Sequence, residues 1–145
     1  MVNPSFIHLH LHTEFSLVDG LIRIKELVKN CAKAQMPAIA ITDMSNLFGL
    51  VKFYKAAQSA GIKPIIGAEV WVQRDNEAPA RLVLLCRNRE GYLNLSRLVS
   101  LSYQQGQQRG VPIVQRAWLT EDSCQGLIAL SAGREGEVGR ALLAG

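Results

Sequence analysis

The sequence has no apolar run of the roughly 20 residues that a membrane-spanning helix requires. Its N-terminus also lacks the basic segment followed by an apolar segment that marks a secretory signal. Cysteine is scarce, and the three residues are far apart and form no zinc-like pair: Cys31, Cys86 and Cys124. We therefore expect a cytoplasmic protein without membrane contact, whose cysteines are reduced and mostly buried.

Several familiar catalytic patterns are missing as well. No glycine-rich phosphate loop is present, and a Ser-His-Asp arrangement is excluded because all three histidines lie in one short stretch. The net charge is only +4, and the basic excess lies in the middle third of the chain. The basic side chains of this third are Lys52, Lys55, Lys63, Arg74, Arg87, Arg89 and Arg97. They either lie along a bound nucleic acid or belong to the solvated protein surface, and we favour the solvated surface.

Strand-like and helix-like patterns alternate along the chain. Period-two alternation and short apolar runs predict strands over 6–12, 38–42, 64–72, 81–86 and 126–132. Apolar residues at helical spacing predict helices over 24–32, 50–60, 89–103 and the last ten residues. The 145 residues, 48% of them hydrophobic, suffice for one domain over 1–145. The pattern favours an α/β fold in which helices cover a parallel sheet.

The stretch FIHLHLHT holds every histidine of the chain. On a strand, residues two apart point to the same side about 7 Å from each other, so two imidazoles can share one ion but three cannot easily do so. We choose His10 and His12, which lie nearer the end of the predicted strand, and give His8 a polar or hydrogen-bonding role. The alternative is a solvated polar face of an edge strand.

Carboxylates follow the same pattern, because Asp19 and Glu69 lie near the ends of predicted strands, as does Asp43. In α/β folds the carboxyl ends of the strands meet at one edge of the sheet, where binding sites form. Imidazole and carboxylate together suit Zn, Mn or Fe, and the sequence does not choose among these metals.

At this point the residues resemble a known family. FIHLHLHTEFSLVDGL, AIAITDMSNLFGLVKFYKAAQSAGIKPIIGAEVWV, LVLLCRNREGYLNLSRLVSLSY and GLIALSAGREGEVGRALL together resemble the PHP (polymerase and histidinol phosphatase) domain of bacterial DNA polymerase III alpha subunits. The resemblance implies a distorted (β/α)7 barrel, of which this chain is an N-terminal fragment truncated before the last strands. It implies a much longer parent, a DNA-directed DNA polymerase (a nucleotidyltransferase) of DNA replication, whose Mg ions lie outside this piece.

The resemblance also implies site residues. Active members bind metal ions in this domain and act as a metal-dependent 3′–5′ exonuclease, and His10, His12, Asp19 and Glu69 match ligand positions of the family. Three departures stand at or beside lost ligands: Met44 after Asp43, Arg81 and Gly133. Arginine stays protonated and cannot ligate, and methionine is a poor ligand for hard cations.

We therefore expect a degenerate metal site and no catalytic residue in this piece. The domain then serves as scaffold and docking surface for a proofreading exonuclease subunit and other replicase subunits, and meets DNA through its parent. Four apolar residues are candidates for such a surface, although we favour buried core for each: Phe15, Leu17, Phe48 and Phe53. We also expect Arg81 to act as an internal cation that pairs with Asp19 or Glu69.

Two alternatives stay open. The chain could be an active metal-dependent 3′–5′ exonuclease or phosphoesterase, with Zn or Mn bound at the histidines. It could also be a soluble α/β domain whose histidines have no chemical role.

Overall fold

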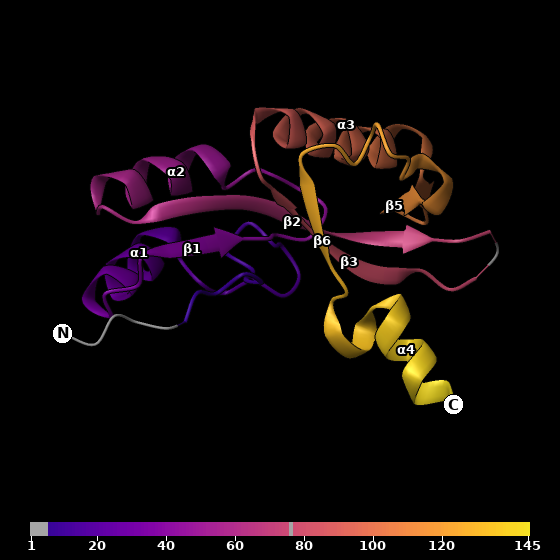
Figure 1. Cartoon of the computed structure of the whole chain (residues 1–145), viewed down its shortest axis with the longest axis horizontal. Coiled ribbons are helices and arrows are strands. Elements are labelled where there is room, and N and C mark those ends of the chain that lie inside the picture. The colour runs from indigo at the N-terminus through magenta and orange to yellow at the C-terminus, as the bar shows by residue number, and fades with distance from the viewer. Residues whose placement is uncertain (1–5, 76) are drawn as a thin grey trace. The chain divides into compact units, whose positions relative to one another are not determined.

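The computed structural model describes residues 6–75 and 77–145, and Figure 1 shows the whole chain. These residues form two compact units, divided between Gly67 and Ala68, and each is described by itself. The division falls inside one continuous strand, β2 (Lys63–Gln73).

The first unit is built around a short buried strand and two helices. They are α1 (Ile24–Lys33), β1 (Ala38–Ile41) and α2 (Leu50–Ser59), which confirms the elements predicted over 24–32, 38–42 and 50–60. β1 pairs in parallel with the first part of β2. The helices meet the strand through one apolar core made of the buried face of each element: Ile24, Leu27, Val28, Cys31, Ile39, Ile41, Phe53, Ala57 and Ile62.

The segment that precedes β1 corrects the sequence prediction. Residues 6–12 are joined to β1 by hydrogen bonds, but they do not form a regular strand. The backbone N–H groups of Ala40 and Thr42 donate to His8 and Leu11, at 2.9 and 2.8 Å. The N–H of Leu11 donates instead to the Thr42 hydroxyl at 2.8 Å, so a side chain replaces the backbone partner that a ladder needs.

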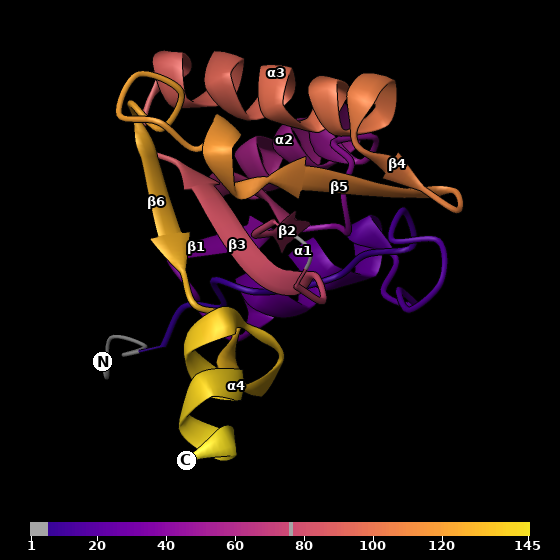
Figure 2. The same cartoon turned by 90° about the vertical axis from the view of Figure 1, so that its right-hand side faces the viewer.

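The second unit places a long helix against strands. After β2 come β3 (Ala80–Cys86), α3 (Arg89–Gln105), β4 (Gln107–Gln108), β5 (Val111–Gln115), the 3-10 turn η1 (Arg116–Trp118), β6 (Leu127–Leu130), the 3-10 turn η2 (Gly133–Glu135) and α4 (Glu137–Ala144). Figure 2 shows α3 running along β5, and α3 also packs on β3. The Asn88 side chain caps α3 by accepting a hydrogen bond from the Gly91 N–H at 2.9 Å.

The strand order in this sheet is β4-β5-β2-β3-β6, with β1 beside β2. Over the described residues the order has ends at β4 and β6, so the sheet is open, in agreement with the expected incomplete barrel. The α/β class is confirmed, but the purely parallel sheet is wrong, because β6 runs antiparallel to β3 and β4 antiparallel to β5. The sequence reasoning missed β4 and β5. Their tight reversal at Arg109 and Gly110, both with positive φ, carries no Asn-Gly or Asp-Gly signal.

The four apolar residues named above divide into two groups. Phe53 is fully buried and Phe15 packs partly buried against the core, as expected. Leu17 and Phe48 are 81% and 66% exposed, so the expectation of buried core is wrong for both. Leu17 lies in a tight loop in which backbone N–H groups donate to carbonyl groups of the same loop, as Gly20 does to Ser16. Its side chain therefore stays outside the core.

The cysteines and the helices agree in part with the first expectations. Within residues 6–75 and 77–145 the cysteines are free thiols, of which Cys31 is buried and Cys86 and Cys124 are half-buried. Over the same residues, no helix combines the length and apolar character needed to cross a bilayer.

Candidate metal centre

The loop from Thr13 to Ile22 holds the first carboxylate of the predicted site. It is closed by the Glu14 N–H donating to Ile22 at 2.8 Å and the Gly20 N–H donating to Ser16 at 2.8 Å. A Cβ atom at Gly20 would lie 1.7 Å from the Thr13 carbonyl oxygen, so only glycine fits there. The glycine of LVDG is therefore a steric requirement of this loop.

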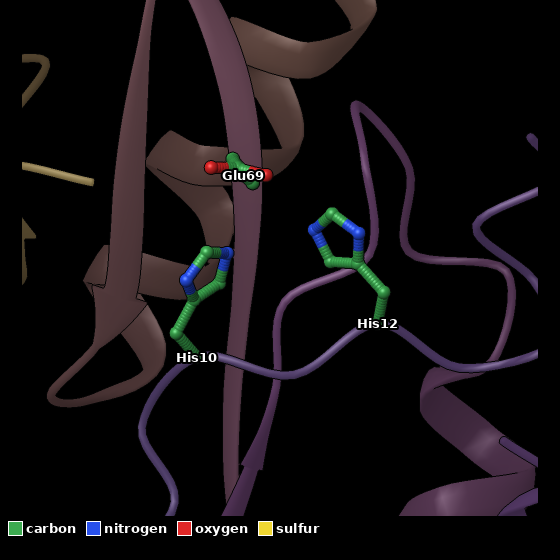
Figure 3. A group of neighbouring side chains, drawn as sticks. All are labelled: His10, His12 and Glu69. Carbon is green, nitrogen blue, oxygen red and sulfur yellow. The ribbon is translucent and has the colours of Figure 1, made fainter. Parts of the chain in front are cut away.

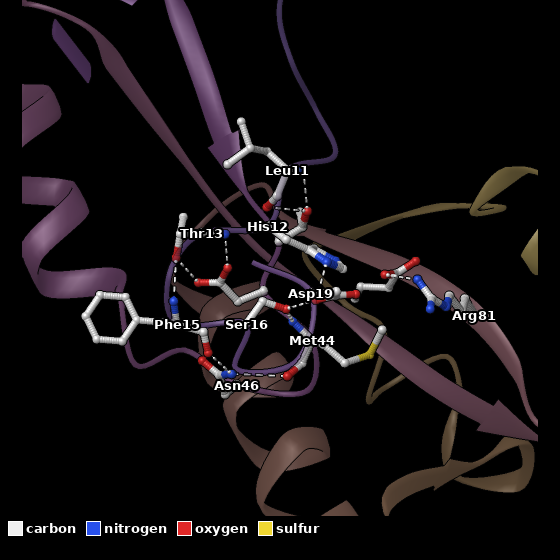
Figure 4. A network of polar contacts seen from close by, with 12 residues as sticks. Leu11, His12, Thr13, Phe15, Ser16, Asp19, Met44, Asn46 and Arg81 are labelled. Carbon is white, nitrogen blue, oxygen red and sulfur yellow. Dashed lines mark hydrogen bonds and ion pairs between the residues drawn. The ribbon is translucent and has the colours of Figure 1, made fainter. Parts of the chain in front are cut away.

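Asp19 contacts one of the predicted histidine ligands. Its Oδ1 lies 3.0 Å from Nδ1 of His12 and accepts a hydrogen bond from the Ser16 hydroxyl at 2.8 Å (Figure 4). A carboxylate that accepts from Nδ1 fixes the ring and leaves Nε2 to face an ion. In this arrangement Asp19 orients His12, and its role as a ligand itself stays a prediction.

His8 lies apart from the pair formed by His10 and His12, as the spacing argument suggested. The rings of His10 and His12 meet edge to face with centroids 5.3 Å apart. The ring of His8 packs edge-on against Phe6 at 4.8 Å, and its backbone carbonyl accepts the hydrogen bond from Ala40. His8 therefore makes an aromatic contact of its own, and His10 and His12 form the pair.

Asp43 and Met44 serve the packing of the loop. Both carboxylate oxygens of Asp43 accept hydrogen bonds from Thr13, at 2.5 Å from its N–H and 2.8 Å from its hydroxyl. Burial raises the pKa of Asp43, although the bonds from Thr13 act in the opposite direction. The Met44 N–H donates to the Ser16 hydroxyl at 3.1 Å, so Ser16 joins Met44 to Asp19 (Figure 4).

In the second unit, Glu69 is paired with Arg81. The Glu69 side chain on β2 is 1% exposed, and its Oε2 lies 3.3 Å from Nη1 of Arg81 on β3. The guanidinium carbon of Arg81 also lies 5.0 Å from the centroid of the Trp71 ring. The expected internal cation at Glu69 is thus observed. Gly133, which the resemblance places at a lost ligand position, is exposed with φ +58° in η2, and a Cβ atom there would meet nothing within 4 Å.

One group of side chains has the composition of a metal site. Its members, drawn in Figure 3, are His10 and His12 of the first unit and Glu69 of the second, and each offers one ligand atom. Two imidazole nitrogens and one carboxylate oxygen are the donors found in catalytic zinc sites and suit manganese as well.

Two participating residues were missed by the sequence reasoning. Trp71 lies two residues after Glu69 on β2, and the period of a strand could have placed both on one face. Ser16 carried no such signal, because its role depends on how the loop after Thr13 closes.

Comparison with known proteins adds independent findings. A family model described as PHP domain matches residues 8–145. The DNA polymerase III subunit alpha of Pseudomonas aeruginosa is 55% identical over 143 residues, which cover 97% of this chain and 12% of that protein. The same subunit of Escherichia coli K12 is 50% identical, with 100% of this chain and 13% of that protein covered. The chain thus spans about an eighth of the length of these relatives.

Solved structures share the fold. An amidohydrolase from Chromobacterium violaceum, with sulfate and no metal bound, has a TM-score of 0.53 and 26% identity, over 66% of this chain and 32% of that one. A protein from Bifidobacterium adolescentis assigned as a metal-dependent phosphoesterase has a TM-score of 0.51 and 19% identity, over 72% of this chain and 37% of that one. The second likeness concerns the fold alone.

Proposed function

Because the chain belongs to the PHP domain family, we propose that it is the N-terminal PHP module of a bacterial DNA polymerase III alpha subunit. The observation that carries the proposal is 50 to 55% identity to such subunits over 97 to 100% of the chain. The parent would be a DNA-directed DNA polymerase of chromosomal replication in the cytoplasm. Its Mg ions and its nucleotide-adding carboxylates would lie in the seven eighths of the relatives that this chain does not match.

Within that parent, we assign the module a scaffold and docking role. Three positions where the resemblance implies ligands carry residues that bind hard cations poorly or not at all: Met44, Arg81 and Gly133. Glu69, the remaining carboxylate ligand, already faces the Arg81 guanidinium. A metal-activated water needs a full ligand set, which these residues do not supply.

The proposed partner is a proofreading exonuclease subunit of the replicase. Leu17 and Phe48 are exposed apolar side chains of the first unit, and the proposal assigns them to the docking contact. The test is co-elution of the alpha subunit that contains this chain with the exonuclease subunit. A Leu17→Asp/Phe48→Asp variant should lose co-elution, and a Lys29→Asp variant in the same unit should keep it. Retained co-elution in the first variant would exclude this surface.

An active metal-dependent phosphoesterase is the second candidate, and the His10, His12 and Glu69 group favours it. Zn or Mn would polarise a phosphoryl oxygen or activate a water there. The test is elemental analysis of the alpha subunit, purified without chelators, beside its His10→Ala/His12→Ala variant. Stoichiometric metal that disappears in the variant would favour this candidate and call for an assay of 3′–5′ cleavage. Absence of metal from both proteins would leave the scaffold role alone.

A further inference from the structure

The first unit separates its acidic side chains from its basic ones. Residues 1–50 contain four acidic and four basic residues, so this part of the sequence carries no net charge. Three of the acids are engaged elsewhere in the structure. Glu14 forms an ion pair with a lysine of α2 at 2.8 Å, Asp19 lies 3.0 Å from a histidine, and Asp43 is buried. Glu26 then remains as the acid beside the basic residues, which all belong to α1 and its N-cap.

Three lysines form a row on the exposed side of α1. Lys25, Lys29 and Lys33 follow one another at a spacing of four residues, which places them on one face of the helix. All three are exposed, and the opposite face of α1 is buried in the core of the unit. Within the part of the chain that the structure describes, no ion pair or side-chain hydrogen bond engages their ammonium groups. We call them the lysine row, and at 1.5 Å per residue it extends over about 12 Å.

This charge pattern acts against the helix that carries it. Like charges four residues apart repel each other, and the lysine row contains two such pairs. Arg23 at the N-cap and Lys25 in the first turn add positive charge at the end of α1 where the macrodipole is already positive. The Arg23 side chain makes no capping hydrogen bond in return. A local pattern that costs stability without a structural gain is typical of a functional surface.

We propose that the lysine row binds the phosphate backbone of duplex DNA without reading its sequence. The choice of DNA rests on the proposed function, in which the parent is a DNA polymerase. Duplex DNA carries one negative charge per about 1.7 Å of its axis, so a row of about 12 Å passes about seven phosphate charges. Lysine is a compact positive charge on a flexible stem, which contacts phosphates and does not require a particular base.

The number of lysines determines how the binding depends on salt. Each phosphate contact releases bound counterions, and log K falls with log[salt] with a slope of about −0.9 per contact. Three contacts give a slope of about −2.7, which corresponds to a roughly 40-fold loss of affinity between about 50 and about 200 mM salt. Neutralisation of the lysine row should therefore weaken binding and flatten the salt dependence together.

The test is titration of a labelled DNA duplex of about 20 base pairs with this chain at about 50 mM salt, followed by fluorescence anisotropy. Lys25→Gln/Lys29→Gln/Lys33→Gln should lose at least about 10-fold in affinity, and its salt slope should be smaller by about 2.7. Glutamine has nearly the helix propensity of lysine and relieves the repulsion, so urea denaturation should show no loss of stability. Lys25→Arg/Lys29→Arg/Lys33→Arg keeps the charge and should bind within about 3-fold of the unsubstituted chain.

A matched control removes the same charge from the second unit. Arg87→Gln/Arg89→Gln/Arg97→Gln replaces three exposed arginines and should leave both the affinity and the salt slope unchanged. Equal losses in the glutamine variants of the two units would mean that net charge alone attracts DNA, and would overturn the lysine row as a site. Tighter binding of single-stranded DNA than of the duplex would overturn the choice of duplex.

The DNA test and the test of the proposed function can fail separately, because they use different residues. Lys29→Asp should keep co-elution with the exonuclease subunit and lose DNA affinity, which would support the lysine row as a second surface of the module. Absence of DNA binding by the unsubstituted chain at about 50 mM salt would overturn the inference and leave co-elution unaffected. DNA binding that depends on the lysine row while co-elution fails would support the row and overturn the docking role.

Discussion

Asp43 accepts two hydrogen bonds from Thr13, one from the backbone N–H at 2.5 Å and one from the hydroxyl at 2.8 Å. Both residues are almost completely buried. The pair joins Thr13, which begins the loop that contains Asp19, to Asp43, which lies two residues after the end of β1. A position that the sequence placed beside a lost ligand is therefore a structural anchor of the loop.

Replacement of this anchor should destabilise the fold. Asp43→Ala leaves the buried N–H and hydroxyl of Thr13 without their acceptor, so we expect the free energy of unfolding to fall by about 2 kcal/mol. Urea denaturation monitored by circular dichroism measures the change. Asp43→Asn retains one carbonyl acceptor and should lose less, and an equal loss in both variants would contradict the assignment.

The pKa of Asp43 predicts a pH dependence of defined sign. Burial raises its pKa above the ordinary 3.8, so the folded state binds this proton more tightly than the unfolded state. The contribution of Asp43 to stability is full below that ordinary value and is lost as the pH rises through the folded-state pKa. The stability of the unsubstituted protein relative to Asp43→Asn should therefore decrease as the pH rises above about 4. A relative stability that increases over this range in urea denaturation would mean that the bonds from Thr13 outweigh burial.

Two phenylalanines offer a matched test of burial in the first unit. Phe53 is 0% exposed and lies in the core, so Phe53→Ala should lower the free energy of unfolding by about 3 to 5 kcal/mol through lost burial and the cavity left behind. Phe48 is 66% exposed, and Phe48→Ala should change it by less than about 0.5 kcal/mol. Both values come from the same chemical denaturation. A large loss at Phe48 would show that its side chain is covered in solution.

The thiol of Cys86 should react slowly in the native protein. Burial raises the pKa of Cys86 from the ordinary 9.0 to about 11, so at about pH 8 its thiolate fraction is about 100-fold smaller than that of an ordinary thiol. Mass spectrometry of iodoacetamide-treated protein should show native Cys86 labelled correspondingly more slowly than Cys86 in urea. Comparable rates in the two states would show that β3 opens readily at its end.

The sequence determined most of the local structure by itself. Apolar spacing identified α1 and α2 within one or two residues, and the fully apolar run of β1 marked a buried strand. These signals are strong because each element must bury one face or both, which fixes the period of its apolar residues. The choice of His10 and His12 over His8 came from the rise of an extended chain, which is also a local property.

Tertiary structure decided what depends on contacts between distant segments. The irregular course of residues 6–12 follows from a bond between Leu11 and the Thr42 side chain, 31 positions apart. The direction of β6 against β3, the bond of Asp19 to His12 and the hold of Thr13 on Asp43 likewise depend on how loops close, which no period records. Arg81 lies between these cases. Chemistry alone predicted that it would neutralise an acid, and only the packing of β3 made that acid Glu69 and added Trp71 as the second support.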